Sequence, residues 1–201
     1  MPTSIIIVDD FLDDPDPLRA AALRLTYPDQ QGAFPGRNSI ERINIEGLDQ
    51  FASDLVGEPL EASGSPLSHA KCRITLAKDI GRAHVHIDSS HWSGILYLSR
   101  PQDCRGGTEF FRHKATNSER APRDQAELEA MGFMDVAQMH REVIERDSKN
   151  PDAWDQVMTA PMRYNRLVML RPWLWHTAGP GFGDSIENGR LVYLMFFKLA
   201  R

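Results

Sequence analysis

The segment AHVHID, residues 83–88, places three possible metal ligands at alternate positions of the chain. Alternation of this kind is typical of a β-strand, in which successive side chains point to opposite faces. A strand here would put His84, His86 and Asp88 on one face. A single strand rarely supplies three ligands to one ion. The segment therefore predicts a metal site and leaves open which two of the three residues bind.

Similar short segments surround it. Their residues are apolar or alternate with polar ones, and Gly, Ser, Asp or Pro separates them, which predicts a β-sandwich or barrel. We expect strands at 4–12, 71–77, 83–88, 93–100, 107–113, 166–172 and 190–200. Helices are expected at 14–28 and 48–56, with a loop at 30–39. A further helical stretch at 124–146, broken near Gly132, has Val136, Met139 and Val143 spaced for one apolar face.

The bulk composition narrows the class of protein. A chain of 201 residues fits one domain, 1–201, with a helical insertion at about 115–158. The net charge of −5 disfavours nucleic acids and anionic membranes as partners. Only two cysteines, no basic leader before the first apolar run, and no membrane-length apolar stretch favour a cytoplasmic protein.

Three residues outside this segment strengthen the metal-site prediction. His176 follows the apolar segment 166–172, from which it could approach across a barrel. Two histidines and one carboxylate on one face of an octahedron leave three positions open, as in non-heme Fe(II) oxygenases. Arg190 begins the last apolar segment and could bind a carboxylate bidentately. Tyr97 offers a hydroxyl group to the same carboxylate.

Together these motifs resemble the Fe(II)/2-oxoglutarate-dependent dioxygenases, and most closely the prolyl-hydroxylase-like branch. The matching features are His86-x-Asp88, YLS at 97–99, GGTEFF at 106–111, His176 and Arg190. The ending YNRLVML…WHTAG…GRLVYLMFF resembles small bacterial members, and the likeness covers about 71–114 and 160–198. The resemblance implies a mainly β fold with flanking helices, a double-stranded β-helix (jelly-roll, cupin-like barrel).

The resemblance also implies roles for individual residues. His86, Asp88 and His176 would bind Fe(II), Arg190 would anchor the C5 carboxylate of 2-oxoglutarate, and Tyr97 would hydrogen-bond to it. Oxidative decarboxylation of 2-oxoglutarate by O2 would be coupled to hydroxylation, or a related oxidation, of an amino acid, a peptide or a small metabolite. Related halogenases have a small residue in place of the carboxylate, so Asp88 favours hydroxylation.

Several alternatives remain open. If His86 and Asp88 bind the metal, His84 belongs to the pocket wall or to the groups behind the ligands. Trp92, His113 and Trp173 flank the metal motifs and are candidate substrate contacts, although tryptophans near a barrel mouth are more often packing residues. The rival function is a non-catalytic, cupin-like metal- and ligand-binding protein, which needs no anchor such as Arg190. A homodimer also stays open.

Overall fold

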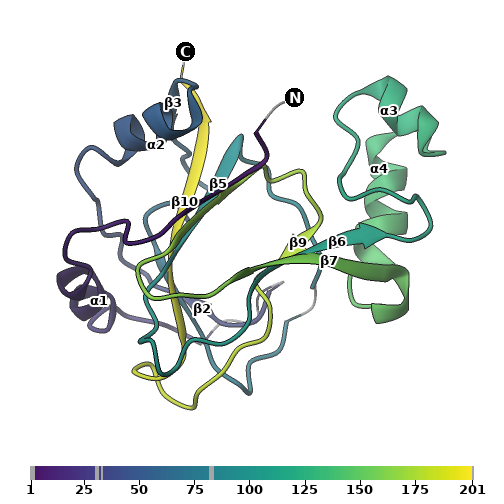
Figure 1. Cartoon of the computed structure of the whole chain (residues 1–201). Helices are drawn as coiled ribbons and strands as arrows, with labels where there is room; N and C mark the ends of the chain where they lie inside the picture. Colours follow the sequence, from purple (N-terminus) through teal and green to yellow (C-terminus); the bar gives the residue numbers. More distant parts are fainter. Residues whose placement is uncertain (1–2, 30–31, 33, 82–83, 201) are drawn as a thin grey trace.

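The fold consists mostly of antiparallel β-structure with few helices (Figure 1). It is seen in a computed structural model that describes residues 3–29, 32, 34–81 and 84–200. The larger sheet has the strand order β1-β8-β5-β10-β4-β2, with β3 also paired to β10. Its strands are β1 (Ile5–Val8), β2 (Arg37–Asn38), β3 (Leu60–Ala62), β4 (Cys72–Thr75), β5 (Trp92–Tyr97), β8 (Leu167–Leu170) and β10 (Arg190–Leu199).

The smaller sheet has the order β7-β6-β9. It is formed by β6 (Gly107–His113), β7 (Trp154–Pro161) and β9 (His176–Thr177). The long β6–β7 ribbon extends away from the larger sheet toward the helices that lie between these two strands in sequence (Figure 1). The described strands form two separate sheets and do not join into one closed barrel.

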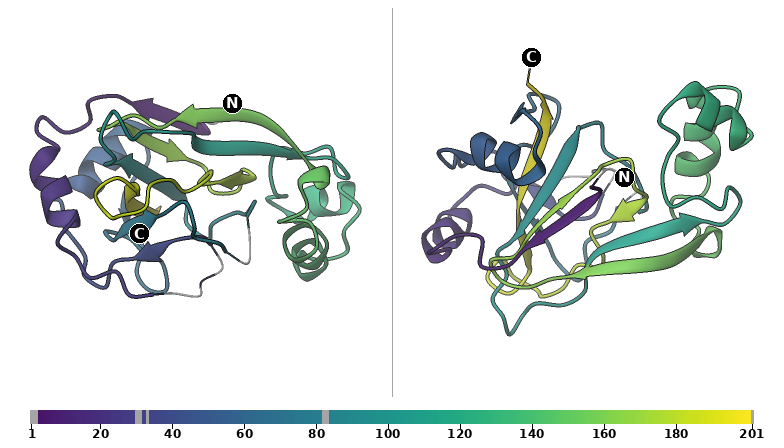
Figure 2. Two further views of the ribbon diagram at one scale, coloured as in Figure 1. Left: turned by 90° about the horizontal axis from the view of Figure 1, so that it is seen from below. Right: turned by 45° about the horizontal axis from the view of Figure 1, so that its top comes forward.

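The helices lie on opposite sides of the molecule. Helices α1 (Asp16–Ala22) and α2 (Leu48–Val56) lie beside the larger sheet, and α3 (Gln125–Ala130) and α4 (Val136–Met139) lie at the far end of the β6–β7 ribbon (Figures 1 and 2). A π-helix, His140–Glu145, continues α4, and a short 3-10 helix, Pro151–Ala153, leads into β7. Of the described helices, none is both long and apolar enough to cross a membrane.

Strand β10 separates the hydrophobic core from a cavity. Its odd-numbered residues, such as Tyr193 and Met195, are buried in a core that also contains residues of α1 and α2. The even-numbered side chains lie on the opposite face, because strand side chains alternate, and four of them line a cavity: Arg190, Val192, Leu194 and Phe196. In β4, Cys72 and Ile74 belong to the same core.

A second core lies beneath the helical insertion. Met139 and Val143 pack there with Val85 and Trp175, which immediately precede two of the predicted metal ligands. The backbone N–H of Val85 donates to the carbonyl of Ser148 at 3.2 Å, and the Ser148 hydroxyl donates to the Val85 carbonyl at 2.8 Å. The insertion therefore supports the chain next to the predicted site from behind.

The strand predicted at 83–88 is wrong. Ala83, like Gln30 of the predicted loop, lies outside the described residues, and residues 84–88 form only one isolated bridge, between His86 and His176. Within the described residues, the segment pairs only with the short strand β9, through His176. His86 and Asp88 still converge on one position from this irregular backbone.

Other boundaries also differ from the predictions. The first helix ends at Ala22, well before the proline that was expected to stop it. The strand β7 begins at Trp154, so the end of the predicted insertion belongs to a sheet. Val136 is 65% exposed, so only Met139 and Val143 of the predicted stripe are buried. The chain does break between α3 and α4, where Gly132 has a φ of +88°.

Candidate metal centre

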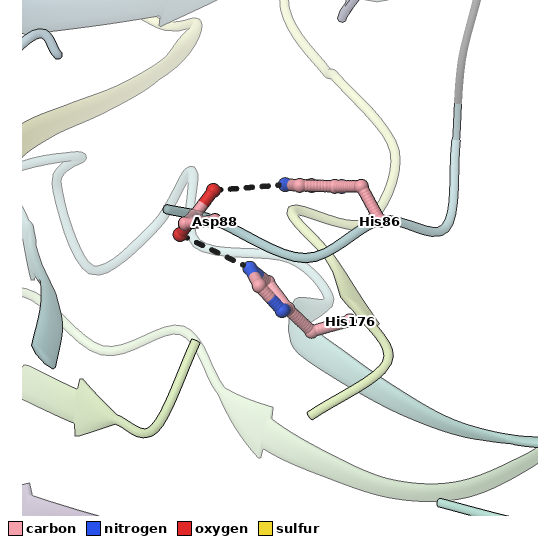
Figure 3. A group of neighbouring side chains, drawn as sticks. All are labelled: His86, Asp88 and His176. Carbon is pink, nitrogen blue, oxygen red and sulfur yellow. Dashed lines mark ion pairs between the residues drawn. The ribbon is translucent and has the colours of Figure 1, made fainter. Parts of the chain in front are cut away.

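Three of the predicted ligands meet in one place. His86 and Asp88 lie in the irregular segment before β5, and His176 is the first residue of β9. Nε2 of His86 lies 3.7 Å from Oδ1 of Asp88, and Nε2 of His176 lies 3.5 Å from Oδ2 (Figure 3). One ligand atom from each residue lies within 4.8 Å of the other two. A single ion between them can contact all three.

The backbone joins the two histidines. The N–H of His86 donates to the carbonyl of His176 at 2.9 Å, and the N–H of His176 donates to the carbonyl of His86 at 3.1 Å. This pair of hydrogen bonds is the isolated bridge described above. It brings together two ligands that are far apart in sequence and holds their rings with centroids 4.5 Å apart.

Each imidazole is also held by a carbonyl two residues earlier in the chain. Nδ1 of His86 lies 2.9 Å from the carbonyl of His84, and Nδ1 of His176 lies 2.8 Å from that of Leu174. A carbonyl can only accept, so Nδ1 carries the proton in both rings and Nε2 is left with its lone pair toward the site. This is the orientation that metal-binding histidines usually have.

Asp88 is held as a carboxylate. Its Oδ2 accepts a hydrogen bond of 2.6 Å from the hydroxyl of Ser93 on β5. Burial alone would raise the pKa of Asp88, but the adjacent His176 and the Ser93 hydroxyl lower it below its usual value. Burial, together with the charge of His176, lowers the pKa of His86 to about 4, so His86 is neutral near pH 7. Burial alone would lower the pKa of His176, but the adjacent Asp88 carboxylate raises it above its usual value.

The donor set fits a divalent transition metal. Two imidazole nitrogens and one carboxylate, contributed from one side, match the facial arrangement that leaves other coordination positions free. The three side chains also line one end of a cavity of about 240 Å³. A metal held there would face the cavity, where a ligand could reach it.

Arg190 lines the same cavity. It is the first residue of β10 and is 2% exposed. Its Nε is buried without a hydrogen-bond partner, and within the described part of the chain no carboxylate forms an ion pair with its guanidinium. Burial lowers its pKa, while Tyr97 and Glu109 raise it. A buried, unpaired guanidinium is costly, so this side chain is suited to bind an anion.

Tyr97 lies beside Arg190 but does not line the cavity. The Arg190 guanidinium carbon lies 5.8 Å from the centre of the Tyr97 ring, within cation–π range. The Tyr97 hydroxyl accepts from the N–H of Thr108 at 2.9 Å, lies 2.8 Å from the Thr108 hydroxyl and donates to the carbonyl of Ala160 at 3.3 Å. Thr108, in contrast, is a polar residue of the cavity wall.

The four predicted substrate contacts are not brought to this cavity. His84 is exposed and lines a neighbouring groove, and its carbonyl is the group that holds His86. Trp92 is fully buried in the core that contains residues of α1 and α2, which we call the helix-backed core. His113 is buried too, with Nε2 3.0 Å from Asp147 Oδ2. Trp173 lies beneath the guanidinium groups of Arg120 and Arg123, each 5.7 Å from its ring centre. Their predicted substrate contacts remain untested.

Several residues of the site were not anticipated. Ser93 holds Asp88, Phe34 lies with its ring centroid 4.0 Å from that of His86, and Arg73 lines the cavity from β4. A signal for Arg73 was present in the sequence, because an arginine that alternates with the apolar residues of KCRITLA must lie on the face opposite the core. Nothing comparable identified Phe34, which lies in an irregular loop.

Solved structures with this fold are oxygenases. HygX from Streptomyces hygroscopicus, solved with nickel, 2-oxoglutarate and hygromycin B bound, matches with a TM-score of 0.56 and 11% identity over 98% of this chain and 84% of that chain. A 2OG-Fe(II) oxygenase family oxidoreductase from Burkholderia pseudomallei matches with a TM-score of 0.52 and 12% identity, over 97% and 84%. The chain therefore has the fold of the Fe(II)/2-oxoglutarate oxygenases, which confirms the resemblance in its sequence.

The sequence family of the chain is shown by a match to a family model rather than by structural similarity. The model described as "Family of unknown function (DUF6445)" matches residues 2–197, and the chain belongs to this family. No curated protein matches the sequence. The activity must consequently be argued from the site itself.

Proposed function

We propose that this protein is an Fe(II)- and 2-oxoglutarate-dependent dioxygenase of the hydroxylase type. The observation on which the proposal rests is one cavity that holds both the His86–Asp88–His176 cluster and the unpaired Arg190. A site that only binds a metal has no need for a buried cation at the far end of its cavity. The cupin-like alternative therefore leaves Arg190 unexplained.

His86, Asp88 and His176 would hold the metal, and Arg190 would bind the C5 carboxylate of 2-oxoglutarate. When bound, the metal and the keto acid would supply the activation of O2 and the oxidation of the substrate. Tyr97 would support the Arg190 guanidinium with its ring and fix Thr108 with its hydroxyl. In this proposal Tyr97 contributes through its neighbours rather than through its own hydrogen bond to the cofactor.

Part of the cavity wall is apolar. Ile95, Val192, Leu194 and Phe196 form an apolar surface between the metal position and Arg190. Apolar walls limit side reactions of an oxidising centre and strengthen the charge interactions at both ends. These side chains come from adjacent strands of the larger sheet, β5 and β10.

The proposal extends to the arrangement of the two sheets. We infer that the two sheets correspond to the halves of a double-stranded β-helix, supported by the fold likeness to two oxygenase structures. A single domain, a cytoplasmic location, a small-molecule or peptide substrate, a homodimer, and the lack of nucleic-acid or membrane partners stay predictions from the sequence.

Calorimetry with Mn(II) in place of iron tests the proposal. We expect the Mn(II)-loaded protein to bind 2-oxoglutarate, and Fe(II) with 2-oxoglutarate under anaerobic conditions to give a metal-to-ligand absorption band. Arg190→Gln should abolish 2-oxoglutarate binding and leave Mn(II) binding nearly intact, because Arg190 does not contact the metal ligands. The proposal is wrong if the wild-type protein shows neither 2-oxoglutarate binding nor the absorption band.

A further inference from the structure

A second guanidinium lines the cavity. Arg73 on β4 lies opposite Val192 of β10 in the sheet ladder, so its side chain faces the cavity beside that of Val192. Arg190 is next but one along β10, opposite Thr75. Two arginines therefore project from neighbouring strands into one enclosed space, and only Arg190 is needed as the anchor for 2-oxoglutarate.

Within the described residues, the hydrogen bonds of Arg73 all go to neutral oxygens. Its Nε donates to the carbonyl of Pro35 at 3.0 Å, and Nη2 donates to the carbonyl of Phe34 at 2.8 Å and also bonds to that of Pro35. Nη1 donates to Oδ1 of Asn38 at 2.6 Å, and the described residues offer no acceptor for its second N–H. In the described part of the chain no carboxylate lies within ion-pair distance of Arg73. Burial and the charge of Arg190 lower the pKa of Arg73 to about 10, so it stays charged at pH 7.

The charges of the cavity do not balance without another anion. Asp88 is the one acidic residue among the described residues that line it. A divalent metal, Asp88, Arg190 and dianionic 2-oxoglutarate together carry no net charge. Asp79 and Glu109 act on Arg73 and Arg190 from outside the cavity lining and without forming ion pairs with them. Among the described lining residues, the charge of Arg73 therefore has no anion facing it, and an unpaired charge in a largely apolar space is costly. An anionic group on the remaining ligand, the substrate, would offset it.

A polar group beside Arg73 could bind the same anion. Nδ2 of Asn38 donates to the hydroxyl of Ser68 at 2.9 Å, and the described residues offer no acceptor for the proton of that hydroxyl. Ser68 lines the cavity together with Pro66, Leu67 and Phe34. Arg73 therefore orients Asn38, and Asn38 orients Ser68. Two donors have no acceptor within the described part of the chain: the Ser68 O–H and the second N–H on Arg73 Nη1.

We propose that the oxidised substrate is an apolar monocarboxylate whose carboxylate binds Arg73 and Ser68. This inference rests on the proposed function, because it assigns Arg190 to 2-oxoglutarate. The substrate's apolar body would lie against Phe34, Leu67 and Phe196. A free ammonium group has no carboxylate partner among the described lining residues except Asp88, which binds the metal. The inference therefore favours carboxylic acids and N-acylated amino acids over free amino acids.

The test compares acids with amides of the same shape. Protein loaded with Mn(II) and 2-oxoglutarate is titrated calorimetrically with butanoate, 4-methylpentanoate, 4-phenylbutanoate and N-acetyl-L-leucine, each paired with its primary amide, and with L-leucine. We expect the best acid to bind about tenfold to a hundredfold more tightly than its amide, as expected for hydrogen bonds to a charged group. L-Leucine should bind more weakly than its N-acetyl derivative.

Variants separate charge from structure. Arg73→Gln should remove the preference for acid over amide while 2-oxoglutarate still binds, and Arg73→Lys, which keeps the charge, should retain part of it. Ser68→Ala leaves every hydrogen bond of Arg73 in place and should weaken acid binding about tenfold, and amide binding less, because a hydrogen bond to a charged acceptor is the stronger one. This variant keeps the test decisive if Arg73→Gln fails to fold.

Three outcomes would overturn the inference alone: equal binding of acids and amides, an unchanged preference in both Arg73→Gln and Ser68→Ala, or no binding of any probe to protein that binds 2-oxoglutarate. Failure of the wild-type protein to bind 2-oxoglutarate would overturn the proposed function, and the inference with it.

Discussion

His84 and His86 are close in sequence but contribute different atoms to the site. His86 directs Nε2 toward Asp88, whereas His84 contributes only its backbone carbonyl, which accepts from Nδ1 of His86. The sequence alone suggested this division, but it could not show that the carbonyl, and not the imidazole, supports His86. Backbone groups leave no trace in a side-chain motif.

The two histidines should respond differently to truncation. Loss of a group that hydrogen-bonds to a metal ligand typically weakens metal binding about tenfold to a hundredfold. His86→Ala removes a proposed ligand itself and should weaken Mn(II) binding by more than that. His84→Ala should leave the affinity nearly unchanged, because every residue has the carbonyl that it supplies. Calorimetric titration of both variants with Mn(II) checks this, and equal losses would contradict the assignment.

Ser93 should matter for the metal although it does not contact it. Its hydroxyl donates to Asp88 at 2.6 Å and fixes the carboxylate, so Ser93→Ala should lower Mn(II) affinity about tenfold. Ser90 is the matched control, since its hydroxyl lies 2.8 Å from that of Ser93 and is not bonded to Asp88. The same titration applies, and a Ser90→Ala loss as large as that of Ser93→Ala would rule out the role of Ser93.

At the scale of elements, strands buried on one or both faces were predictable and irregular ones were not. The segments that became β5, β6, β8 and β10 have apolar residues at buried positions, so periodicity identified them. Strand β7 is exposed at four consecutive positions, 155–158, on the edge of its sheet and has no such pattern. The conformation of the candidate metal-site segment 84–88 is set by contacts with His176 and Ser148, which local sequence does not encode.

Gly107, the first residue of β6, lies where β6 and β7 pair too closely for a side chain. A Cβ on Gly107 would lie 2.0 Å from the carbonyl oxygen of Ala160 on β7, so the two strands cannot pair as closely with any other residue. Gly107→Ala should destabilise the fold by about 1–3 kcal/mol, as overpacking does. Chemical denaturation measures this cost.

Gly64 provides the control for Gly107. A Cβ on Gly64 would meet nothing within 4 Å, and its φ is not positive. Gly64→Ala should therefore change the free energy of unfolding by no more than about 0.5 kcal/mol. Similar effects of the two substitutions would show that strand spacing is not the reason for glycine at 107.

At the scale of the whole molecule, the insertion and the site share one core. Val85 and Trp175, each next to a candidate metal ligand, are buried with Met139 and Val143 of the insertion. The sequence indicated an insertion beside the sheet, but not that it packs behind both ligand-bearing segments. That arrangement depends on the β6–β7 ribbon, one strand of which was not predicted.

The insertion should therefore be coupled to metal binding. Met139→Ala in the insertion and Leu60→Ala in the helix-backed core should each cost about 2–5 kcal/mol of stability, since both residues are buried. Only Met139→Ala should also weaken Mn(II) binding. Amide hydrogen exchange should show Mn(II) slowing exchange at 84–88 and near Ser148; protection confined to 84–88 would mean that the insertion is uncoupled.

The carbonyls that orient His86 and His176 have a consequence for variation within the family. Each ring takes its direction from the main chain two positions before it, at residues 84 and 174. Because any amino acid supplies the same carbonyl, these positions can change identity without turning the imidazoles. A substitution at 84 can therefore reshape the neighbouring groove that this side chain lines, while the carbonyl that orients His86 stays in place.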